Sequence, residues 1–205
     1  MANSNVIELD SMQRDFLTEL GNIGGGCAAT SLSVLLNSSL TMAVPKVKVL
    51  EFSDLTEIFG GADSIVVAVL SPIVGDLNGM MMFVLEREKA KRLADALVKD
   101  GRDYGEFTDM DLSAIKEIGN IIISTYLGSL ESLTRFKIRT TPPEIGIDMA
   151  GAILSVPAIE FGNAGDKALV IEADFVDKEL DIDGHIILLS EVHSYDKMYK
   201  ALGVE

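Results

Sequence analysis

The amino-acid sequence predicts an α+β fold in which two similar halves, each ordered helix, strand, strand, strand, helix, share one sheet packed by long helices. Three observations lead to this prediction: an eight-residue polar pattern occurs twice, the segments after it repeat at the same spacing, and apolar residues in each half change from helical to strand periods and back. Such alternation is typical of helices layered on a sheet. The connection over residues 99–105 is too short to keep the halves independent, which favours one merged sheet over two domains.

An internal repeat gives the boundaries of the halves. Glu19 and Glu117 lie 98 positions apart, and Asp76-Leu77-Asn78-Gly79 matches Asp181-Ile182-Asp183-Gly184 at an offset of 105. A period near 100 residues is too long for a solenoid and fits a duplicated half-domain. We therefore expect a single domain over residues 1–205 with repeats at 11–100 and 108–203.

A long helix is expected at the start of each half. Ser11 is the expected N-cap of the first helix, and Thr108 with Asp111 predicts a capping box for the second, with Asp in place of the usual Glu. The helical spacing of apolar residues marks the buried faces, which are Phe16, Leu20, Ile23 and Cys27 on the first helix and Ile115, Ile118, Ile122 and Tyr126 on the second. Cys27 is therefore expected to be a small buried residue, and a single cysteine fits a reducing compartment.

Strands and closing helices follow from the remaining patterns. Runs of β-branched and apolar residues predict strands, and the Asp-Leu-Asn-Gly segment predicts a turn before one of them. The expected strands are 44–49, 65–70 and 79–85 in the first half and 144–147, 168–172 and 185–189 in the second. The expected closing helices are 87–99 and 194–202, with short extra helices after Ser53 and after Asp148.

Composition and charge exclude several classes of function. The formal net charge of −15 repels nucleic acid and anionic lipid. The apolar run 65–70 is far shorter than the roughly 18 residues of a membrane span, and the N-terminus lacks the pattern of an export signal. His185 and His193 lack partners at metal-ligand spacing and are expected to be structural. These features predict a cytoplasmic protein without nucleic-acid binding or membrane insertion.

Each half carries the same polar stripe on its first helix. Asp or Ser is followed by Glu four residues later and Asn three residues further, as Asp15, Glu19 and Asn22 in the first half and Ser113, Glu117 and Asn120 in the second. Positions i, i+4 and i+7 fall within one narrow stripe of a helix, so the amide and the carboxylate point outward together. A single stripe of this kind is most often a solvated face, whereas its recurrence at equivalent positions favours a function.

Glycine is frequent beside both stripes. A helical Gly is about 1 kcal/mol less favourable than Ala, so the run 24–26, Gly21 and Gly119 are expected to permit close approach of a partner or of a packed element. A phosphate-binding loop is excluded because the run is followed by no Gly-Lys-Ser/Thr and preceded by no strand.

The repeated pattern resembles that of the CheC/CheX/FliY family of chemotaxis phosphatases. The segments Glu19-Leu20-Gly21-Asn22-Ile23-Gly24-Gly25-Gly26 and Glu117-Ile118-Gly119-Asn120-Ile121 carry the resemblance, which covers nearly the whole chain. Within that family, some members carry one motif and pair as dimers, and others append a flagellar switch domain. Two motifs in a chain that ends at Glu205 predict a CheC-type member that is a monomer.

The resemblance implies hydrolysis of the aspartyl phosphate of the response regulator CheY. Because phosphoryl transfer to water depends on positioning and charge neutralisation, Asn22 and Asn120 are expected to orient the attacking water. The two glutamates would pair with a lysine of CheY, since a carboxylate aimed at the phosphate would repel it, and Asp15 and Ser113 would contact the rim of CheY. The Mg²⁺ ion of the reaction belongs to CheY, so no metal or cofactor of the chain's own is expected.

Alternative functions follow from the same residues. The chain could be a non-catalytic adaptor that binds phosphorylated CheY and regulates the receptor deamidase CheD, but both asparagines are present, which favours the enzyme. The resemblance also implies CheD binding through the short helix after Asp148, where the segment 148–154 lies. An equally weighted interpretation of Asp148 is an N-cap followed by a turn that faces the core.

Overall fold

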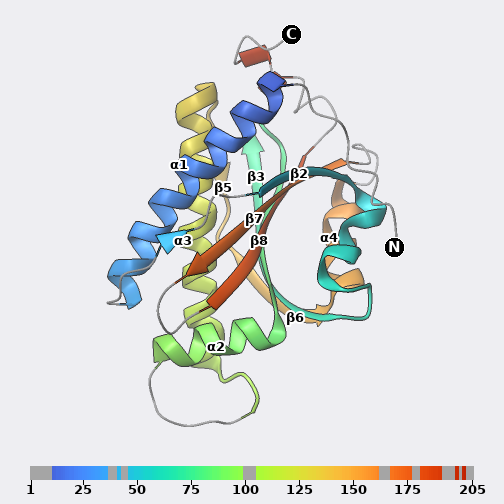
Figure 1. Ribbon diagram of the computed structural model, residues 1–205. Helices are drawn as coiled ribbons and strands as arrows, with labels where there is room; N and C mark the ends of the chain where they lie inside the picture. The colour runs from blue at the N-terminus through green and yellow to red at the C-terminus, as the bar shows by residue number, and fades with distance from the viewer. Residues whose placement is uncertain are drawn as a thin grey trace.

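A computed structural model of the chain describes residues 11–36, 41–42, 46–98, 105–161, 167–176, 181–190, 197–198 and 200–201. In chain order the elements are α1 (Ser11–Leu36), β1 (Thr41–Met42), β2 (Lys46–Glu51), the 3-10 helix η1 (Phe52–Phe59), β3 (Ile65–Gly75), β4 (Gly79–Glu86), α2 (Arg87–Val98), α3 (Asp109–Thr134), β5 (Ile138–Thr140), β6 (Glu144–Met149), α4 (Ala150–Phe161), β7 (Lys167–Val176) and β8 (Asp181–Ser190) (Figure 1). The α+β class expected from the sequence is confirmed.

The strand order of the sheet mirrors the internal repeat. The order is β1-β7-β8-β4-β3-β5, with β2 also paired to β7 and β6 also paired to β3. The central strands β4 and β8 come from different halves, and Met82 of β4 pairs with Ile187 of β8, which lies 105 positions later. Because 105 is also the offset of the repeat in this region, the pseudo-two-fold axis passes through this pair.

The two halves exchange strands, which makes the sheet a joint structure. The first-half strand β2 pairs antiparallel with the second-half strand β7, from Lys46 opposite Glu172 to Glu51 opposite Lys167. In the same way, β6 of the second half pairs with β3 of the first. Each half therefore completes the sheet of the other, and the prediction of one shared sheet is confirmed.

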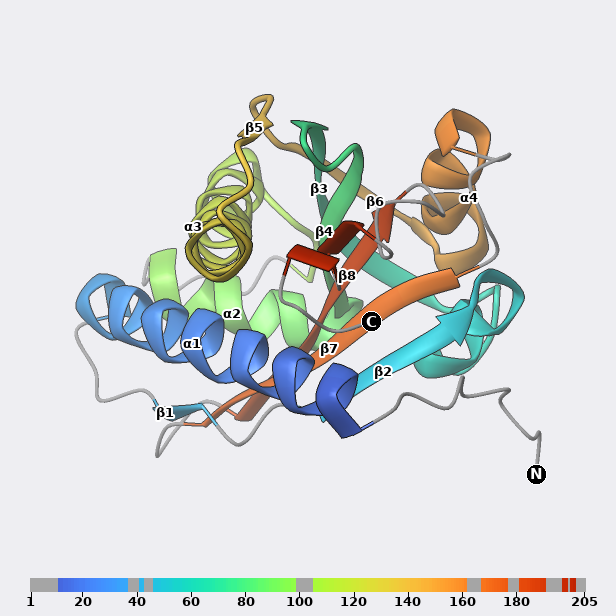
Figure 2. The same ribbon diagram turned by 90° about the horizontal axis from the view of Figure 1, so that it is seen from above.

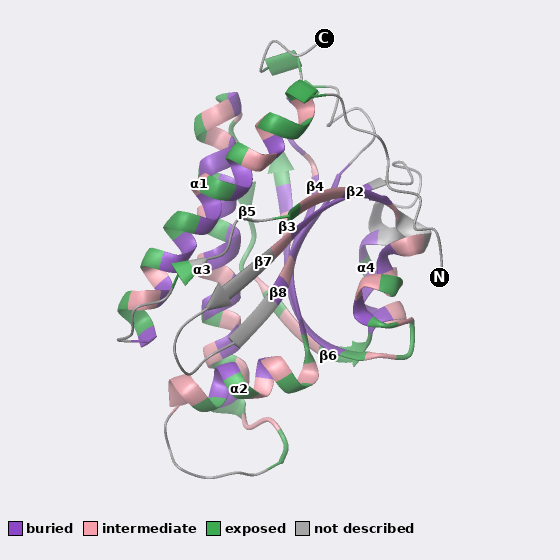
Figure 3. Cartoon of the chain, in the orientation of Figure 1, coloured by how far each residue is buried: buried purple, intermediate pink, exposed green. Residues whose placement is uncertain are grey.

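Helices cover both faces of the sheet. Successive side chains of a strand point to opposite faces, so Val67 and Val69 pack in the core under α1, α2 and α3, whereas Val66 and Ala68 pack under η1 and α4. Figures 1 and 2 show α1 and α3 on one side of the strands and α4 on the other. Figure 3 shows that the strands between these layers are largely buried. The long helices therefore leave their outer sides free.

Local signals in the sequence predicted several elements correctly. The Thr108 N–H donates to Oδ2 of Asp111 at 2.9 Å and the Asp111 N–H donates to Oγ1 of Thr108 at 3.2 Å, which confirms the capping box. The short helices expected after Ser53 and Asp148 are η1 and α4. Ser11 is the first residue of α1 rather than the residue before it.

Some residues of the expected strands and helices lie outside the described residues. These parts include the start of the strand 44–49, His193 and most of the helix 194–202, of which the four described residues are helical.

Asp181–Gly184, which matches the turn segment of the first half in sequence, does not form a turn. These residues open β8 and pair with β7, whereas the turn at Asp76–Asn78 does join β3 to β4. A Cβ on Gly79 would lie 2.1 Å from the Leu189 carbonyl oxygen, and a Cβ on Gly184 would lie 2.6 Å from the Phe83 ring. The equivalent glycines therefore allow close packing at the centre of the sheet, and the sequence pattern resembled a turn for that reason.

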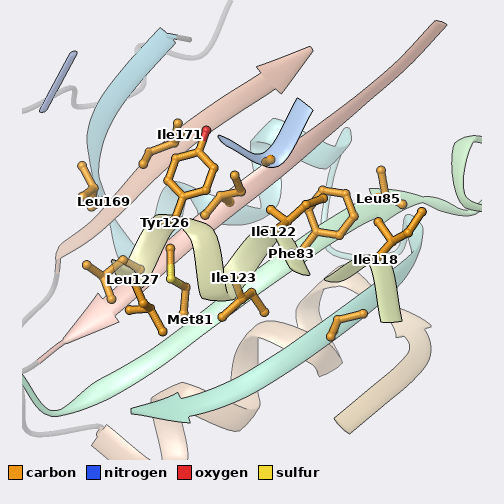
Figure 4. Close-up of a cluster of buried hydrophobic side chains, with 14 of the residues drawn as sticks. Met81, Phe83, Leu85, Ile118, Ile122, Ile123, Tyr126, Leu127, Leu169 and Ile171 are labelled. Carbon is orange, nitrogen blue, oxygen red and sulfur yellow. The ribbon is translucent and has the colours of Figure 1, made fainter. Parts of the chain in front are cut away.

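The buried face of α3 was predicted correctly, whereas that of α1 was not. Ile115, Ile118, Ile122 and Tyr126 are all buried, and Figure 4 shows the last three in a cluster of buried hydrophobic side chains. On α1, Phe16 and Ile23 are only half-buried and Cys27 is exposed. Leu20 is buried as expected. The other buried residues of α1 are mainly small or lie one position away from those expected: Leu17, Gly21, Gly24, Gly25, Ala28, Ala29, Leu32 and Leu36. A face rich in Gly and Ala gives little apolar periodicity, which explains the error.

Candidate functional site

The first polar stripe lies on the outer side of α1. Asp15, Glu19 and Asn22 are all exposed, while the intervening Leu20 and Gly21 are buried. This arrangement follows from the helix period, because the two residues between Glu19 and Asn22 turn toward the interior. The helix thus presents the carboxylate and the amide together, as the sequence predicted.

The second stripe lies at the equivalent place on α3. Ser113 and Glu117 are exposed and Asn120 is half-buried, with Ile118 and Gly119 buried beneath them. Among the residues that the structure describes, neither stripe glutamate nor either stripe asparagine makes a hydrogen bond or ion pair through its side chain. These polar groups are therefore available to another molecule.

The two stripes point away from each other. Tyr126, which contacts α1, lies nine residues after Glu117, and Gly24, which contacts α3, lies five residues after Glu19. At about 100° per residue, each contact is some 140–180° around the helix from the glutamate of its own stripe. The stripes therefore form two separate surfaces rather than one composite cleft.

A tight contact between α1 and α3 holds the backbone next to the first stripe. A Cβ on Gly24 would lie 2.6 Å from Cδ1 of Tyr126. The Tyr126 hydroxyl donates to the carbonyl oxygen of Gly21, the residue before Asn22, at 3.4 Å. Burial raises the pKa of the Tyr126 hydroxyl, so it remains a donor over the whole physiological range.

The glycines beside the stripes serve mainly internal packing. A Cβ on Gly119 would lie 2.6 Å from the Val69 side chain, as Gly24 lies against Tyr126, whereas a Cβ on Gly26 would meet nothing within 4 Å. Of the two expected uses, close approach of a packed element thus holds for Gly24 and Gly119. The apolar periodicity predicted Tyr126 as a core residue but did not predict its contact with Gly24. The glycine run on one helix and the large residue on the other could have suggested this contact.

Asp148 occupies an exposed position at the junction of β6 and α4. Its Oδ1 accepts a hydrogen bond from the Met149 N–H at 2.7 Å. The first amides of α4 donate elsewhere, from Ala150 to the Ser64 carbonyl at 2.8 Å and from Gly151 to a carbonyl of the same loop at 2.9 Å. Asp148 therefore precedes the helix as a strand residue and does not cap it, contrary to one of the two interpretations of the sequence.

The described residues contain neither a metal-binding cluster nor a membrane-spanning helix. Within the described ranges, no group of three or more His, Cys, Asp or Glu side chains is arranged to hold a metal ion. His185 instead packs edge-on against the Phe59 ring, with centroids 5.1 Å apart. In the same part of the chain, no helix has the length and apolarity needed to cross a membrane.

Comparison with known proteins gives the family of the chain. The model of the CheC-like family matches twice, at residues 12–49 and 110–147, and these two ranges are separated by the same 98 positions as the stripes. The chain is 35% identical over 197 residues to the CheY-P phosphatase CheC of Bacillus subtilis, a match that covers 93% of this chain and 94% of the relative.

Other relatives and solved structures agree with this assignment. The chain is 30% identical over 142 residues to the flagellar motor switch phosphatase FliY of Bacillus subtilis, covering 68% of this chain and 37% of FliY. The fold matches the crystal structure of Thermotoga maritima FliY with a TM-score of 0.75 at 24% identity, covering 96% of this chain and 98% of that one. On the duplicated motif, its two family matches and the identity to a relative over nearly the full length, the chain belongs to the CheC-like family.

Proposed function

We propose that this chain is a CheY-P phosphatase that hydrolyses the aspartyl phosphate of a CheY-type response regulator at two sites, one on each stripe. The observation that supports this proposal most directly is the duplicated pair of Glu and Asn on the outer face of a long helix, whose side chains make no hydrogen bond or ion pair with the described residues. The identity to a named CheY-P phosphatase over 94% of its length supports the same substrate.

The asparagines would place the attacking water. In the reaction, the oxygen of a water molecule forms a bond to phosphorus while the bond from phosphorus to the aspartate oxygen breaks, giving inorganic phosphate and a free carboxylate. An amide can accept a hydrogen bond from the water with its oxygen and donate one to a phosphoryl oxygen with its nitrogen. Asn22 and Asn120 would thus hold the water in line, which is the main contribution that a protein makes to this kind of transfer.

The glutamates would fix the orientation of the regulator. Glu19 and Glu117 lie about one turn before the asparagines, roughly 4.5 Å along the helix, close enough for one regulator to contact both members of a stripe. A carboxylate favours a cation, so the proposed partner group is a lysine beside the phosphate. Asp15 and Ser113 lie one further turn away and would contact the rim of the regulator.

The metal ion of the reaction would come with the regulator. The fold also matches a CheX chain of Borrelia burgdorferi that was crystallised with CheY, BeF3 and Mg2+, with a TM-score of 0.50 at 20% identity, and that match covers 82% of this chain. With both sites on one chain, we further propose that the protein acts as a monomer in the cytoplasm without a cofactor of its own. Sedimentation of the purified chain tests the oligomeric state.

The test of the proposed function is the decay of a phosphorylated CheY-type regulator. The parent chain should accelerate loss of phosphate, and the double variant Asn22→Ala, Asn120→Ala should reduce the acceleration on the order of 10²-fold. Because these side chains make no hydrogen bond or ion pair with the described residues, the melting temperature should stay nearly constant. Unchanged decay with the folded double variant would overturn the proposal.

A second proposal concerns a receptor deamidase of the CheD type, which Asp148 and α4 would bind. It is supported by the exposure of Asp148 and by the amides of α4 being bonded elsewhere, together with the family resemblance. Asp148→Lys should abolish capture of the deamidase while stimulated decay persists, because a like-charge contact at an interface commonly costs a few kcal/mol. Glu144→Lys, an exposed residue at the other end of β6, is the matched control. Equal capture by both variants would contradict this docking surface.

The decay assay, together with a binding measurement, also distinguishes the enzyme from an adaptor. An adaptor that only senses phosphorylated CheY would bind it without shortening its lifetime, and would pass the signal to the deamidase. A chain that binds the phosphorylated regulator and leaves its decay unchanged would establish this alternative function.

A further inference from the structure

A large exposed apolar side chain precedes each stripe on its helix. Met12 on α1 is 56% exposed and Met110 on α3 is 64% exposed. The two methionines lie 98 positions apart, three residues before Asp15 and Ser113 respectively. They therefore belong to the repeated unit in the same way as the stripe residues themselves.

Helical geometry places each methionine in line with its stripe. Met12 lies seven residues before Glu19, and Met110 lies seven before Glu117, so each pair shares nearly the same direction on its helix two turns apart. The neighbouring Asp111 is turned inward, where its carboxylate completes the cap of α3 and lies 3.6 Å from Nζ of Lys91. The methionine is thus directed to the surface that presents the glutamate and the asparagine.

The recurrence separates these methionines from ordinary exposed apolar residues. Single exposed apolar side chains are common on protein surfaces and need no explanation. On the described parts of α1 and α3, the other large exposed apolar residues are Val34 and Leu35. Their equivalents 98 positions later are Ser132, which is polar, and Leu133, which is half-buried. The methionines are thus the exposed large apolar pair that the two helices share.

We propose that Met12 and Met110 are apolar anchors that bind the response regulator at the end of each stripe remote from the asparagine. This inference rests on the proposed function and identifies a further contact for the same partner. An interface of standard size buries about 800 Å² on each partner, and Met lies about 15 Å along the helix from Asn, so one regulator spans both. Methionine suits this position because its unbranched thioether adapts to irregular apolar surfaces.

The position of the anchors predicts which kinetic parameter they affect. A side chain about 15 Å along the helix from the asparagine that places the water contributes binding and no chemistry, so its removal should raise KM and leave kcat unchanged. The contact is apolar, so the rise should be the same at low and high salt, unlike the effect of changing a stripe carboxylate. This salt independence distinguishes an apolar anchor from a general change in the charge of the surface.

The test isolates one stripe at a time. In a chain carrying Asn22→Ala, the remaining decay of a phosphorylated CheY-type regulator reports the second stripe, so Met110→Ala should raise KM about tenfold while Met12→Ala should have no effect. In a chain carrying Asn120→Ala the roles should reverse. Met110→Leu should restore affinity, and Val34→Ala, an exposed apolar residue of α1 outside both stripes, should be silent in both backgrounds.

A binding measurement keeps the inference separate from hydrolysis. Titration with the beryllofluoride-activated regulator should show about tenfold weaker binding at one of the two sites for each methionine variant, while the other site keeps the affinity of the parent chain. If the parent chain binds the regulator but neither methionine variant changes KM or affinity, the assignment of the methionines as anchors is wrong and the proposed function stands. If the parent chain neither binds the regulator nor shortens its phosphorylated lifetime, the proposed function fails and this inference fails with it.

Discussion

The helices α1 and α3 carry equivalent stripes but contact each other through residues of opposite size. Gly24 of α1 lies against the ring of Tyr126 of α3. The positions equivalent to these two, at the offset of 98, are Ile122 of α3 and Ala28 of α1, both buried. At both pairs of equivalent positions, α1 therefore carries the small residue and α3 the large one.

This comparison separates the parts of the repeat that serve packing from those that serve binding. The side of each helix that faces the core changes between the halves, because a large residue on one helix can be matched by a small residue on the other. The outer sides of the two helices retain Glu and Asn at the same positions although these side chains make no hydrogen bond or ion pair with the part of the chain that the structure describes. The repeat thus differs where only complementarity matters and agrees where a partner would bind.

The largest effect should come from breaking the asymmetric contact. Gly24→Ala places a Cβ within 2.6 Å of the Tyr126 ring and should lower the free energy of unfolding by about 2 kcal/mol. Gly26→Ala, two residues away with nothing within 4 Å, should raise it by about 0.5–1 kcal/mol. Denaturant unfolding measures both. Adding Tyr126→Leu to Gly24→Ala should recover part of the loss, and equal effects of the two alanines would contradict the packing described.

A second prediction tests whether the two stripes keep the same residues because a partner binds them. In a chain carrying Asn120→Ala, Glu19→Lys should raise KM for the phosphorylated regulator about tenfold with little change in kcat, because it places like charges opposite each other. The increase should shrink as salt rises. Glu57→Lys, an exposed residue of η1 on the other side of the sheet, makes the same change in net charge and should leave KM unaltered. A fall in kcat at saturating regulator would assign the carboxylate to the chemistry instead.

The smallest predicted effect concerns the start of α3. Thr108→Ala removes one arm of the capping box and should lower the free energy of unfolding by about 1 kcal/mol, or the melting temperature by about 2–4 °C. Thr30→Ala on α1 is the control, because that hydroxyl only donates to the Gly26 carbonyl of its own helix. A loss with Thr30→Ala as large as with Thr108→Ala would show that the cap is not what stabilises this end.

The sequence predicted what depends on local pattern and repetition. The capping box, the buried face of α3, the central strands and the stripe residues all follow from short-range periodicity or from the offset of 98. The strand exchange between β2 and β7 could not be predicted, because partner choice in a sheet depends on the whole chain. The prediction for the buried face of α1 was wrong in part because Gly24 packs against the ring of Tyr126, a contact between residues about 100 positions apart.

The most direct test of the account is the decay of a phosphorylated CheY-type regulator with each asparagine changed alone. The stripes face away from each other, so each should work without the other. Asn22→Ala and Asn120→Ala should each retain part of the stimulated rate, and the two residual rates should add up to the rate of the parent chain. Complete loss of stimulation in either single variant, with the fold intact by melting temperature, would show that the two stripes form one composite site and would contradict the account.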